Sequence, residues 1–350
     1  MRPVVSDVIL LPGRCNTHCH LRDEQADDQE LLPHVAPIQA ANFDWCVGMP
    51  NTTKPILTGE DAQRYLERIN RYAPNLGIIP VNYLTVDTTR QMVREAARAG
   101  VKAYKLYIGG ATTNSAHGVP VTRLDELDDR LQEMENAGLR LCIHAEDPRE
   151  PSFRARETAF LPLFRRMVEK HPQLLIVFEH ISSAEAIDVC SPYPNVWMGV
   201  TPHHLWLTED DALGMEDYLC MPVVKTARDR AALRTLFGSG HPRVLIGLDD
   251  APHTIMRKRD RRPGQKPPSG IWCTEAGLPV YAAVLAELDA LDLLPDLIWG
   301  NAARLYNLPS PTCPVQVVRK SLTIRVEDDP SRPQPFLAGQ TLDWSIEPSP

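Results

Sequence analysis

Short apolar runs alternate along the chain with longer amphipathic segments. Eight such runs occur, in the order CNTHCHL, FDWCVGMP, GIIPVNYLT, VKAYKLYI, LRLCIHAE, LLIVFEHI, NVWMGVTPHHL and RVLIGLDDAPH. Several are apolar almost throughout, which is typical of buried parallel strands. Eight alternations of strand and helix predict an α/β fold, a (β/α)8 TIM barrel. A doubly wound parallel sheet is the alternative, because alternation alone does not establish that the sheet closes.

The amphipathic segments between these runs carry the signals of helix ends. The clearest helical segments span residues 59–72, 89–100 and 122–138. Gly100 and Gly138 stand where helix carboxyl ends are expected, since glycine accepts a left-handed backbone. Ser182 with Glu185 three residues later fits a capping box, in which each side chain bonds the other residue's backbone. These signals predict helices between the strands.

The pattern changes after residue 307. Residues 308–350 are rich in proline and contain two short alternating runs, and no linker rich in glycine and serine precedes them. We therefore expect residues 1–307 to form the barrel and residues 308–350 to form an extension packed on it within the same domain.

Composition narrows the class of protein. The 350 residues include 37 basic and 45 acidic side chains, and the net charge of −8 argues against nucleic acid or an anionic membrane as a partner. No apolar run approaches the roughly 20 residues that span a bilayer, and the amino terminus lacks the features of a signal peptide. The eight cysteines are scattered without a CxxC pair, which indicates reduced thiols and a cytoplasmic protein.

Polar residues interrupt the apolar runs mainly at their carboxyl ends. In a barrel these ends converge on one mouth, where catalytic residues of this fold lie. A single histidine at a strand end is more often structural than a ligand, but a set of histidines with an aspartate at matching ends is poorly explained by packing. The set comprises His18, His20, Asn51, Lys105, His144, His180, Asp249, Asp250 and His253.

The chemistry of this set favours a metal site. Histidine nitrogens and a carboxylate oxygen are ligands that Zn²⁺ accepts. His18, His20 and Arg22 follow the period of a strand, so their side chains point to one face, a poor arrangement for a core. Lys105 is the exception, because a free ammonium repels a metal. Either it is a structural lysine that extends out of the strand, or its amine has added CO2 and the resulting carbamate bridges two metals.

Several motifs together resemble a known family. The stretches HCHLRD, MPNTTKP, KLYIGGATTNSAHG, FEHI and DDAPH resemble, in order and spacing, those of class II dihydroorotase in the amidohydrolase superfamily. The tail stretch PFLAGQTLDWSIE is similar to that family's carboxyl-terminal extension, so the likeness runs from about residue 10 to the end. The histidine pair marks only the superfamily. The segment from Lys105 and the four-residue step from Asp249 to His253 are more specific.

The resemblance implies a role for each matching residue. Six residues would hold two Zn²⁺ ions: His18, His20, Lys105, His144, His180 and Asp249. Eight would contact the substrate: Arg22, Asn51, Thr112, Thr113, His144, Met221, His253 and Ser269. Lys105 would be modified by CO2 to N6-carboxylysine and would bridge both metals together with a hydroxide. Asp249 is chosen over Asp250 because it alone keeps the four-residue step to His253.

The activity that the resemblance implies is a reversible ring closure. Hydroxide between the metals would attack the ring amide, and Asp249 would act as general acid and base. In reverse, N-carbamoyl-L-aspartate would condense to L-dihydroorotate, the third step of de novo pyrimidine synthesis. Arg22, Asn51 and His253 would bind the substrate carboxylate. The family suggests a homodimer.

Two rival interpretations share parts of this pattern. Another cyclic amidase, such as a hydantoinase or allantoinase, would keep the metal ligands but would not need the three residues that bind a carboxylate. A catalytically inactive dihydroorotase-like scaffold would be expected to lack a ligand or the lysine. The sequence retains all of these residues, so it favours an active dihydroorotase.

Overall fold

A computed structural model describes residues 7–22, 31–112, 115–264, 266–309 and 314–348 of the chain. Its centre is an eight-stranded sheet in which each strand pairs in parallel with the next along the chain. These strands are β2 (Cys15–Cys19), β3 (Trp45–Gly48), β4 (Gly77–Leu84), β5 (Ala103–Leu106), β6 (Arg140–Ile143), β7 (Leu175–Phe178), β8 (Val196–Val200) and β9 (Val244–Ile246).

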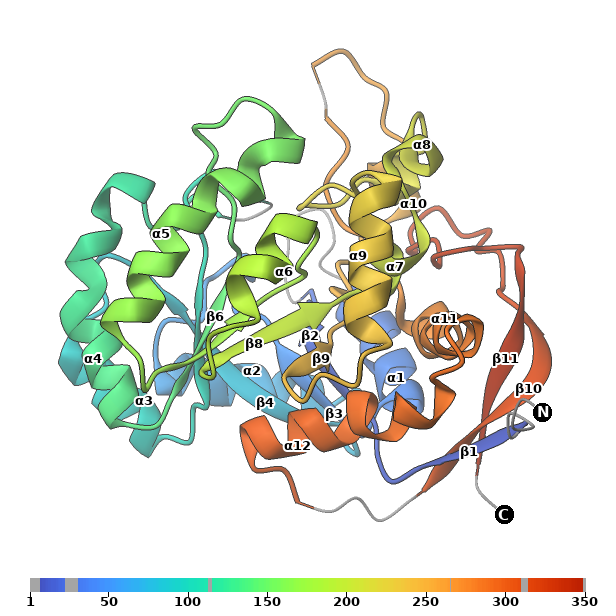
Figure 1. Ribbon diagram of the computed structural model, residues 1–350, viewed down its shortest axis with the longest axis horizontal. Coiled ribbons are helices and arrows are strands. Elements are labelled where there is room, and N and C mark those ends of the chain that lie inside the picture. The colour runs from blue at the N-terminus through green and yellow to red at the C-terminus, as the bar shows by residue number, and fades with distance from the viewer. Residues whose placement is uncertain (1–6, 23–30, 113–114, 265, 310–313, 349–350) are drawn as a thin grey trace.

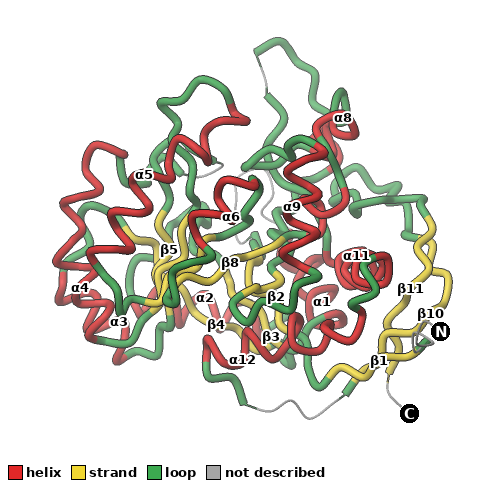
Figure 2. The backbone as a smooth tube through the Cα atoms, in the orientation of Figure 1, coloured by secondary structure: helices red, strands yellow, loops and turns green. Residues whose placement is uncertain are grey.

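The sheet curves round until its last strand meets its first. A parallel bridge joins Cys19 to Asp250, just beyond β9, and the backbone N–H of His20 donates to the carbonyl of Asp250 at 2.8 Å. The side chain of Asn16 accepts from the backbone N–H of Leu248 at 2.9 Å. The predicted (β/α)8 barrel is therefore confirmed, with strands at the centre and helices around them (Figures 1 and 2).

Helices follow the strands and cover the barrel. They are α1 (Leu31–Asn42), α2 (Gly59–Asn70), α3 (Arg90–Arg98), α4 (Asp128–Asn136), α5 (Arg156–Lys170), α6 (Ala184–Cys190), α7 (Pro202–Trp206), α8 (Glu209–Ala212), α9 (Ala227–Phe237), α10 (Ile255–Lys258), α11 (Thr274–Glu287) and α12 (Asn301–Tyr306). Leucine, isoleucine, valine and aromatic side chains between helices and strands form one buried apolar cluster. No helix in the described ranges is long and apolar enough to cross a membrane.

Most helix ends lie where the sequence places them. Gly100 and Gly138 follow α3 and α4 with φ of 90° and 65°, the left-handed conformation expected at helix carboxyl ends. The predicted helix over residues 122–138 begins as a 3₁₀ segment, Val121–Leu127, before α4. The capping prediction at Ser182 was wrong by one residue. Ser183 caps α6 by accepting from the N–H of Ala186 at 3.2 Å.

Ser182 has a different partner that the sequence does not reveal. Its backbone N–H and hydroxyl both donate to Oε2 of Glu157, at 3.0 and 2.7 Å. Glu157 comes from α5, so the predicted cap residue instead links two consecutive helical units.

The segment after the barrel forms a second, antiparallel sheet. Strands β10 (Val315–Thr323) and β11 (Thr341–Pro348) pair with each other, and β10 also pairs with β1 (Val8–Leu11). This sheet packs against α11 at one side of the barrel (Figure 1). The sequence pattern indicated the two late strands, but it did not indicate that an early strand joins them.

Candidate active site

The carboxyl ends of the strands gather the polar residues into one pocket. His18 lies in β2, His144 is the residue after β6, His180 is the second residue after β7, and Asp249 follows β9. The pocket is lined by His18, His20, Arg22, Asn51, Tyr107, Thr112, His144, His180, Met221, Asp249, Ala251, Ser269 and Gly270. Lys105 lies fully buried in β5, and Thr113 lies outside the described residues.

Three ligand atoms converge within this pocket. Nε2 of His18 and Nε2 of His20 lie 3.2 and 3.3 Å from Oδ1 of Asp249, and 3.3 Å from each other. Donor atoms about 2.0–2.1 Å from a tetrahedral Zn²⁺ are roughly 3.3–3.4 Å apart. The spacing of the three atoms therefore fits one metal ion.

The hydrogen bonds of the two Nδ1 atoms, which point away from Asp249, indicate which nitrogen of each ring carries the proton. Nδ1 of His18 lies 2.9 Å from Oε2 of Glu179, and Nδ1 of His20 donates to Oδ1 of Asn51 at 2.8 Å. A carboxylate and an amide oxygen only accept, so the protons lie on the two Nδ1 atoms. Both Nε2 lone pairs then face the Asp249 carboxylate. Three acceptors at this distance repel one another unless a cation lies between them.

A second pair of histidines lies beside the first group. Nδ1 of His144 is 3.1 Å from Nε2 of His180, and Nε2 of His144 lies 2.7 Å from Oε2 of Glu146. The Glu146 contact places the proton on Nε2, so Nδ1 of His144 offers its lone pair toward His180. Nδ1 of His180 is buried without a hydrogen-bond partner. This pair could contribute nitrogen ligands to a second metal.

Lys105 lies in the floor of the site without a hydrogen-bond partner. The residue is fully buried, and Nζ makes no hydrogen bond. Burial lowers the pKa of this amine, although Glu179, Cys142 and Asp249 oppose the shift. A neutral amine without a hydrogen-bond partner is the form that can add CO2. The interpretation in which Lys105 extends out of the strand has no support, since the side chain does not reach solvent.

Electrostatics keep the ligand atoms in the forms that bind cations. Burial lowers the pKa of His20 to about 3, so the ring is neutral near pH 7. A neutral imidazole is the form of His20 that can bind a cation.

Three residues of the site have strained backbones. Arg22, His180 and Asp249 have φ of 40°, 40° and 48°, a region that residues other than glycine rarely adopt. Each such residue costs on the order of 1–3 kcal/mol and persists where the surroundings hold it. These three residues thus have an unfavourable backbone conformation, and the sequence pattern does not predict it.

Glu179 and Glu146 are functional candidates that sequence reasoning missed. Both are fully buried, and each orients a histidine of the site from behind. Such outer carboxylates fix the tautomer and raise the basicity of the inner nitrogen. The signal available in the sequence was a glutamate inside an apolar strand run, one residue before His180 and two residues after His144.

The neighbouring aspartates at the end of β9 have separate surroundings. Asp249 faces the histidines, whereas the carboxylate of Asp250 accepts from the side chains of Asn16, Gln39 and Thr274 and from the backbone N–H of Cys273. Burial raises the pKa of Asp250 to about 7. Asp250 therefore ties β2, α1 and α11 together and does not face the pocket.

The residues expected to bind a carboxylate also lie together. Nη2 of Arg22 is 3.0 Å from Nε2 of His253, and Nε of Arg22 donates to the carbonyl of Pro252 at 3.1 Å. Nε2 of His253 is also 3.1 Å from the carbonyl of Ser269. Of these residues, Arg22 and Ser269 line the pocket that contains the ligand atoms.

A further cluster, His203, His204 and Cys220, lies buried near this pocket. Nδ1 of His204 is 2.6 Å from the hydroxyl of Thr201, and its Nε2 is 3.1 Å from the carbonyl of Pro222. Both ring nitrogens of His204 are thus occupied by hydrogen bonds. The cluster is better explained as packing at the end of β8 than as a metal site.

The barrel and the convergent ligand atoms define a hydrolase of the amidohydrolase class. No family model matches the chain. A dihydroorotase of Coxiella burnetii (strain RSA 331 / Henzerling II) is 34% identical, with 94% of this chain and 95% of that protein covered. A dihydroorotase of Halorhodospira halophila (strain DSM 244 / SL1) is 35% identical, with coverage of 97% and 99%. The chain belongs to the dihydroorotase family of the amidohydrolase superfamily, whose members are hydrolases that act on a cyclic amide.

Comparison of structures separates this family from its nearest rival. Dihydroorotase from Saccharomyces cerevisiae, in complex with 5-fluoroorotic acid, superposes with a TM-score of 0.91 at 28% identity and covers 98% of this chain and 99% of that chain. An L-hydantoinase from Arthrobacter aurescens gives 0.78 at 16% identity, covers 97% of this chain and 83% of that chain, and so shows the fold alone. The comparisons support a dihydroorotase over a hydantoinase.

Proposed function

We propose that the chain catalyses the reversible hydrolysis of L-dihydroorotate to N-carbamoyl-L-aspartate. In synthesis, the reverse direction closes the ring for pyrimidine production. The observation that carries this proposal is one pocket in which convergent ligand atoms lie beside an arginine and a histidine suited to a carboxylate. A hydantoinase requires the first group but not the second.

The proposed cofactors are two Zn²⁺ ions per chain. His18, His20 and Asp249 would hold one, His144 and His180 would hold the other, and Lys105 would reach both. The facing lone pairs and the tetrahedral spacing support this assignment. Bound there, the ions would lower the pKa of water and polarise the amide carbonyl of the ring.

Lys105 would serve as a bridge after it adds CO2. A bond forms between Nζ and the carbon of CO2, the amine loses one proton, and the product is a carbamate anion. The buried amine without a hydrogen-bond partner supports this modification, because an ammonium in this place would have neither solvent nor acceptor. The carbamate would supply two oxygens on the side of the site where β5 lies.

Asp249 would move the proton in the reaction. Water attacks the ring carbonyl, a C–O bond forms, and Asp249 accepts the proton that the water loses. The carboxylic acid then delivers this proton to the ring nitrogen as the C–N bond breaks. The first role requires that Asp249 is ionised before attack.

Arg22 would bind the substrate carboxylate, with Asn51 and His253 beside it. A guanidinium forms paired hydrogen bonds with a planar carboxylate, which fixes the plane of the ring as well as its position. Thr112, Met221 and Ser269 line the same pocket and would contact the rest of the ring. Thr113 is proposed as a further contact from the family resemblance alone.

The location and assembly of the protein complete the proposal. Seven cysteines in the described part are free and buried, which supports a cytoplasmic location. A homodimer is proposed from the resemblance, and light scattering of the purified protein would test it. The barrel and its extension are proposed to fold as one domain.

The experiment that tests the function measures metal and turnover on one preparation. Purified protein is expected to contain about two divalent ions per chain and to open L-dihydroorotate, and it should close N-carbamoyl-L-aspartate at lower pH. Chelation should abolish both reactions, and Zn²⁺ should restore them. Hydrolysis of hydantoin without turnover of L-dihydroorotate would overturn the assignment, as would full activity in a metal-free preparation.

A further inference from the structure

Lys258 is a buried cation that the proposed reaction does not use. It ends the short helix α10 and is 4% exposed. Its Nζ donates to three backbone carbonyls, those of Leu219 at 3.1 Å, Pro268 at 3.2 Å and Gly270 at 2.9 Å. An ammonium has three N–H donors, so each one has a carbonyl.

These three carbonyls belong to two segments that flank the pocket. One is residues 219–224, which contains Met221, and the other is residues 268–270, which contains Ser269. Met221, Ser269 and Gly270 all line the pocket. The carbonyl of Leu219 also accepts from the N–H of Gly270 at 2.9 Å. Lys258 therefore closes a junction between two walls of the site.

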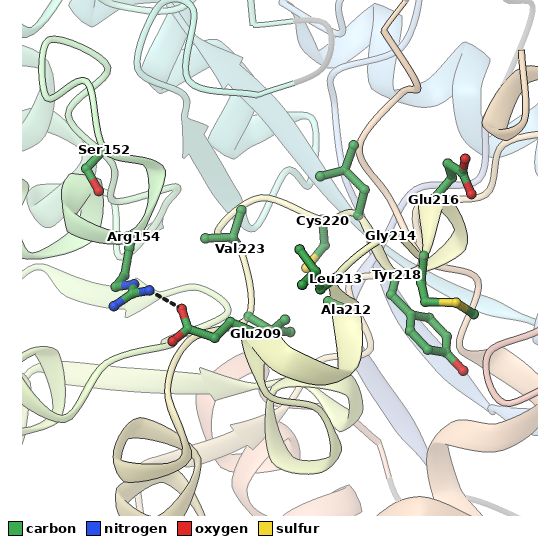
Figure 3. A pocket seen from close by; sticks show the side chains of 13 residues that line it. Ser152, Arg154, Glu209, Ala212, Leu213, Gly214, Glu216, Tyr218, Cys220 and Val223 are labelled. Carbon is green, nitrogen blue, oxygen red and sulfur yellow. Dashed lines mark ion pairs between the residues drawn. The ribbon is translucent and has the colours of Figure 1, made fainter. Parts of the chain in front are cut away.

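The first of these segments also borders a cavity. Residues Leu219, Cys220, Val223 and Val224 line a second pocket of about 540 Å³, together with residues of α8 and the ion pair of Arg154 with Glu209 (Figure 3). Where a chain segment borders an open pocket, no side chains of the protein pack against it on that side. The position of residues 219–224 then depends more on hydrogen bonds. The hydrogen bonds from Lys258 are charge-assisted, which makes them stronger than those between neutral groups.

The second segment is fixed to the strand end that carries the metal ligand. Gly270 has φ of 150°, and a Cβ there would lie 2.2 Å from the carbonyl oxygen of Ala251. The N–H of Ala251 donates to the carbonyl of Ile271 at 3.0 Å. Ala251 is two residues beyond Asp249. The contacts with Ala251 therefore link the junction held by Lys258 to the chain segment that contains Asp249.

We propose that Lys258 is a positioning residue, whose ammonium holds the segments of Met221 and Ser269 at the separation at which they bind the substrate ring. Lys258 lines neither wall of the pocket and does not touch the reacting atoms, so it acts through the two segments. This inference rests on the proposed function, because it takes the two walls to be substrate contacts.

The ionisation of Lys258 gives a signature of this role. Burial lowers the pKa of Lys258 to about 8, while Cys220, Asp217 and Glu216 oppose the shift. The two carboxylates are themselves paired, Asp217 with Arg259 and Glu216 with Arg261. A neutral amine has two N–H donors and no charge, so one carbonyl loses its partner as pH rises through about 8. KM should therefore rise with pH in this range.

The test compares two cations that bond only to backbone carbonyls in the hydrogen bonds of the structure. Lys258→Met keeps the length of the side chain and removes its donors. The control is Arg140→Met, since Arg140 donates to the carbonyls of Leu305 and Gly138 at the opposite end of the barrel. Zn²⁺-loaded enzyme is assayed on L-dihydroorotate from pH 7 to 10, and binding of L-dihydroorotate is measured by calorimetry.

Lys258→Met should raise KM roughly tenfold or more, with kcat within about threefold of wild type. Its KM should no longer rise above pH 8. Arg140→Met should lower thermal stability and leave KM and its pH profile as in wild type. A purely structural role for Lys258 would instead lower thermal stability without this change in KM.

An active wild type with unchanged KM in Lys258→Met overturns this inference alone. If Lys258→Met does not fold, the KM of Lys258→Gln and the pH dependence of the wild-type KM are measured instead. A wild-type KM that stays constant from pH 7 to 10 overturns the inference. A wild type that neither binds nor turns over L-dihydroorotate overturns the proposed function, and this inference with it.

Discussion

Two arginines at one end of the barrel and two polar groups at the other end have opposite hydrogen-bonding surroundings. At the amino ends of the strands, Arg14 bonds to the carboxylate of Asp44 and to a carbonyl, and Arg140 bonds to carbonyls of Leu305 and Gly138. At the carboxyl ends, Nζ of Lys105 and Nδ1 of His180 lack hydrogen-bond partners. Folding explains the first set, because each donor gains an acceptor that replaces water.

At the mouth of the barrel, at the carboxyl ends of the strands, several buried polar groups lack a favourable partner. Lone pairs of His18 and His20 face a carboxylate, and a buried amine has no acceptor. Such an arrangement costs free energy in the chain alone and would become favourable with the proposed cation and carbamate in place. The contrast teaches that unsatisfied buried groups indicate a site where several of them converge. Substitutions at the two ends should therefore fail in different ways.

The largest effect is expected for His180→Ala. Loss of a proposed metal ligand should remove several kcal/mol of transition-state stabilisation, so kcat should fall by about a thousandfold or more. Bound metal, measured by elemental analysis, should fall with it, while circular dichroism shows a folded barrel. His241→Ala, just before β9 at the opposite end, is the control and should keep both metal and turnover. Equal losses in the two variants would refute the contrast between the ends.

Lys105→Ala is also expected to lose bound metal and turnover, but an added carboxylic acid should partly restore both. The variant should bind metal weakly and be nearly inactive, and a short carboxylic acid at high concentration should partly restore metal and activity by supplying the missing oxygens. Lys102→Ala should behave as wild type, because Lys102 is exposed. Native mass of the active enzyme should include one CO2 per chain. An unmodified amine in a metal-loaded, active enzyme would exclude the bridge.

An intermediate effect is expected for Arg22→Met at the rim of the mouth. Loss of a charge-assisted contact with the substrate carboxylate should cost about 2–4 kcal/mol, or roughly 30- to 1000-fold in kcat/KM. The metal content should stay at the wild-type level, which separates this variant from the ligand variants. Wild-type hydrolysis of L-dihydroorotate by Arg22→Met would remove the basis for the carboxylate assignment and favour a hydantoinase-like substrate.

The sequence pattern predicted the alternating strands and helices of the barrel. Strand runs such as LLIVFEHI report their burial directly, and the barrel itself brings the strand ends together, so the sequence alone predicts that His144 and His180 share one site. The outer carboxylates could not be placed in this way. Glu179 resembles an ordinary strand residue until its distance of 2.9 Å to His18, from another strand, is known.

Other features depend on backbone geometry or on contacts distant in sequence. The positive φ of Arg22, His180 and Asp249 follows from the surrounding packing and has no local signal such as glycine. The pairing of β1 with β10 joins segments about 300 residues apart, and neither segment specifies the other. Ser182 illustrates a local error, because its neighbour Ser183 offers the same capping chemistry and the hydroxyls of both serines donate to Glu157.

The smallest effect is expected for Arg140→Met, at the end of the barrel opposite to the pocket. Arg140 begins β6, and its guanidinium links this strand to the carbonyl of Leu305 in α12. Methionine retains the apolar stem but leaves that carbonyl without its donor, which should cost about 1–2 kcal/mol of the free energy of unfolding and lower Tm by about 2–4 °C. Denaturant and thermal unfolding measure this, and kcat, KM and metal content should be unchanged. A fall in metal content or kcat in a folded Arg140→Met would mean that the two ends are coupled, and the distinction between structural and functional buried charge in this barrel would not hold.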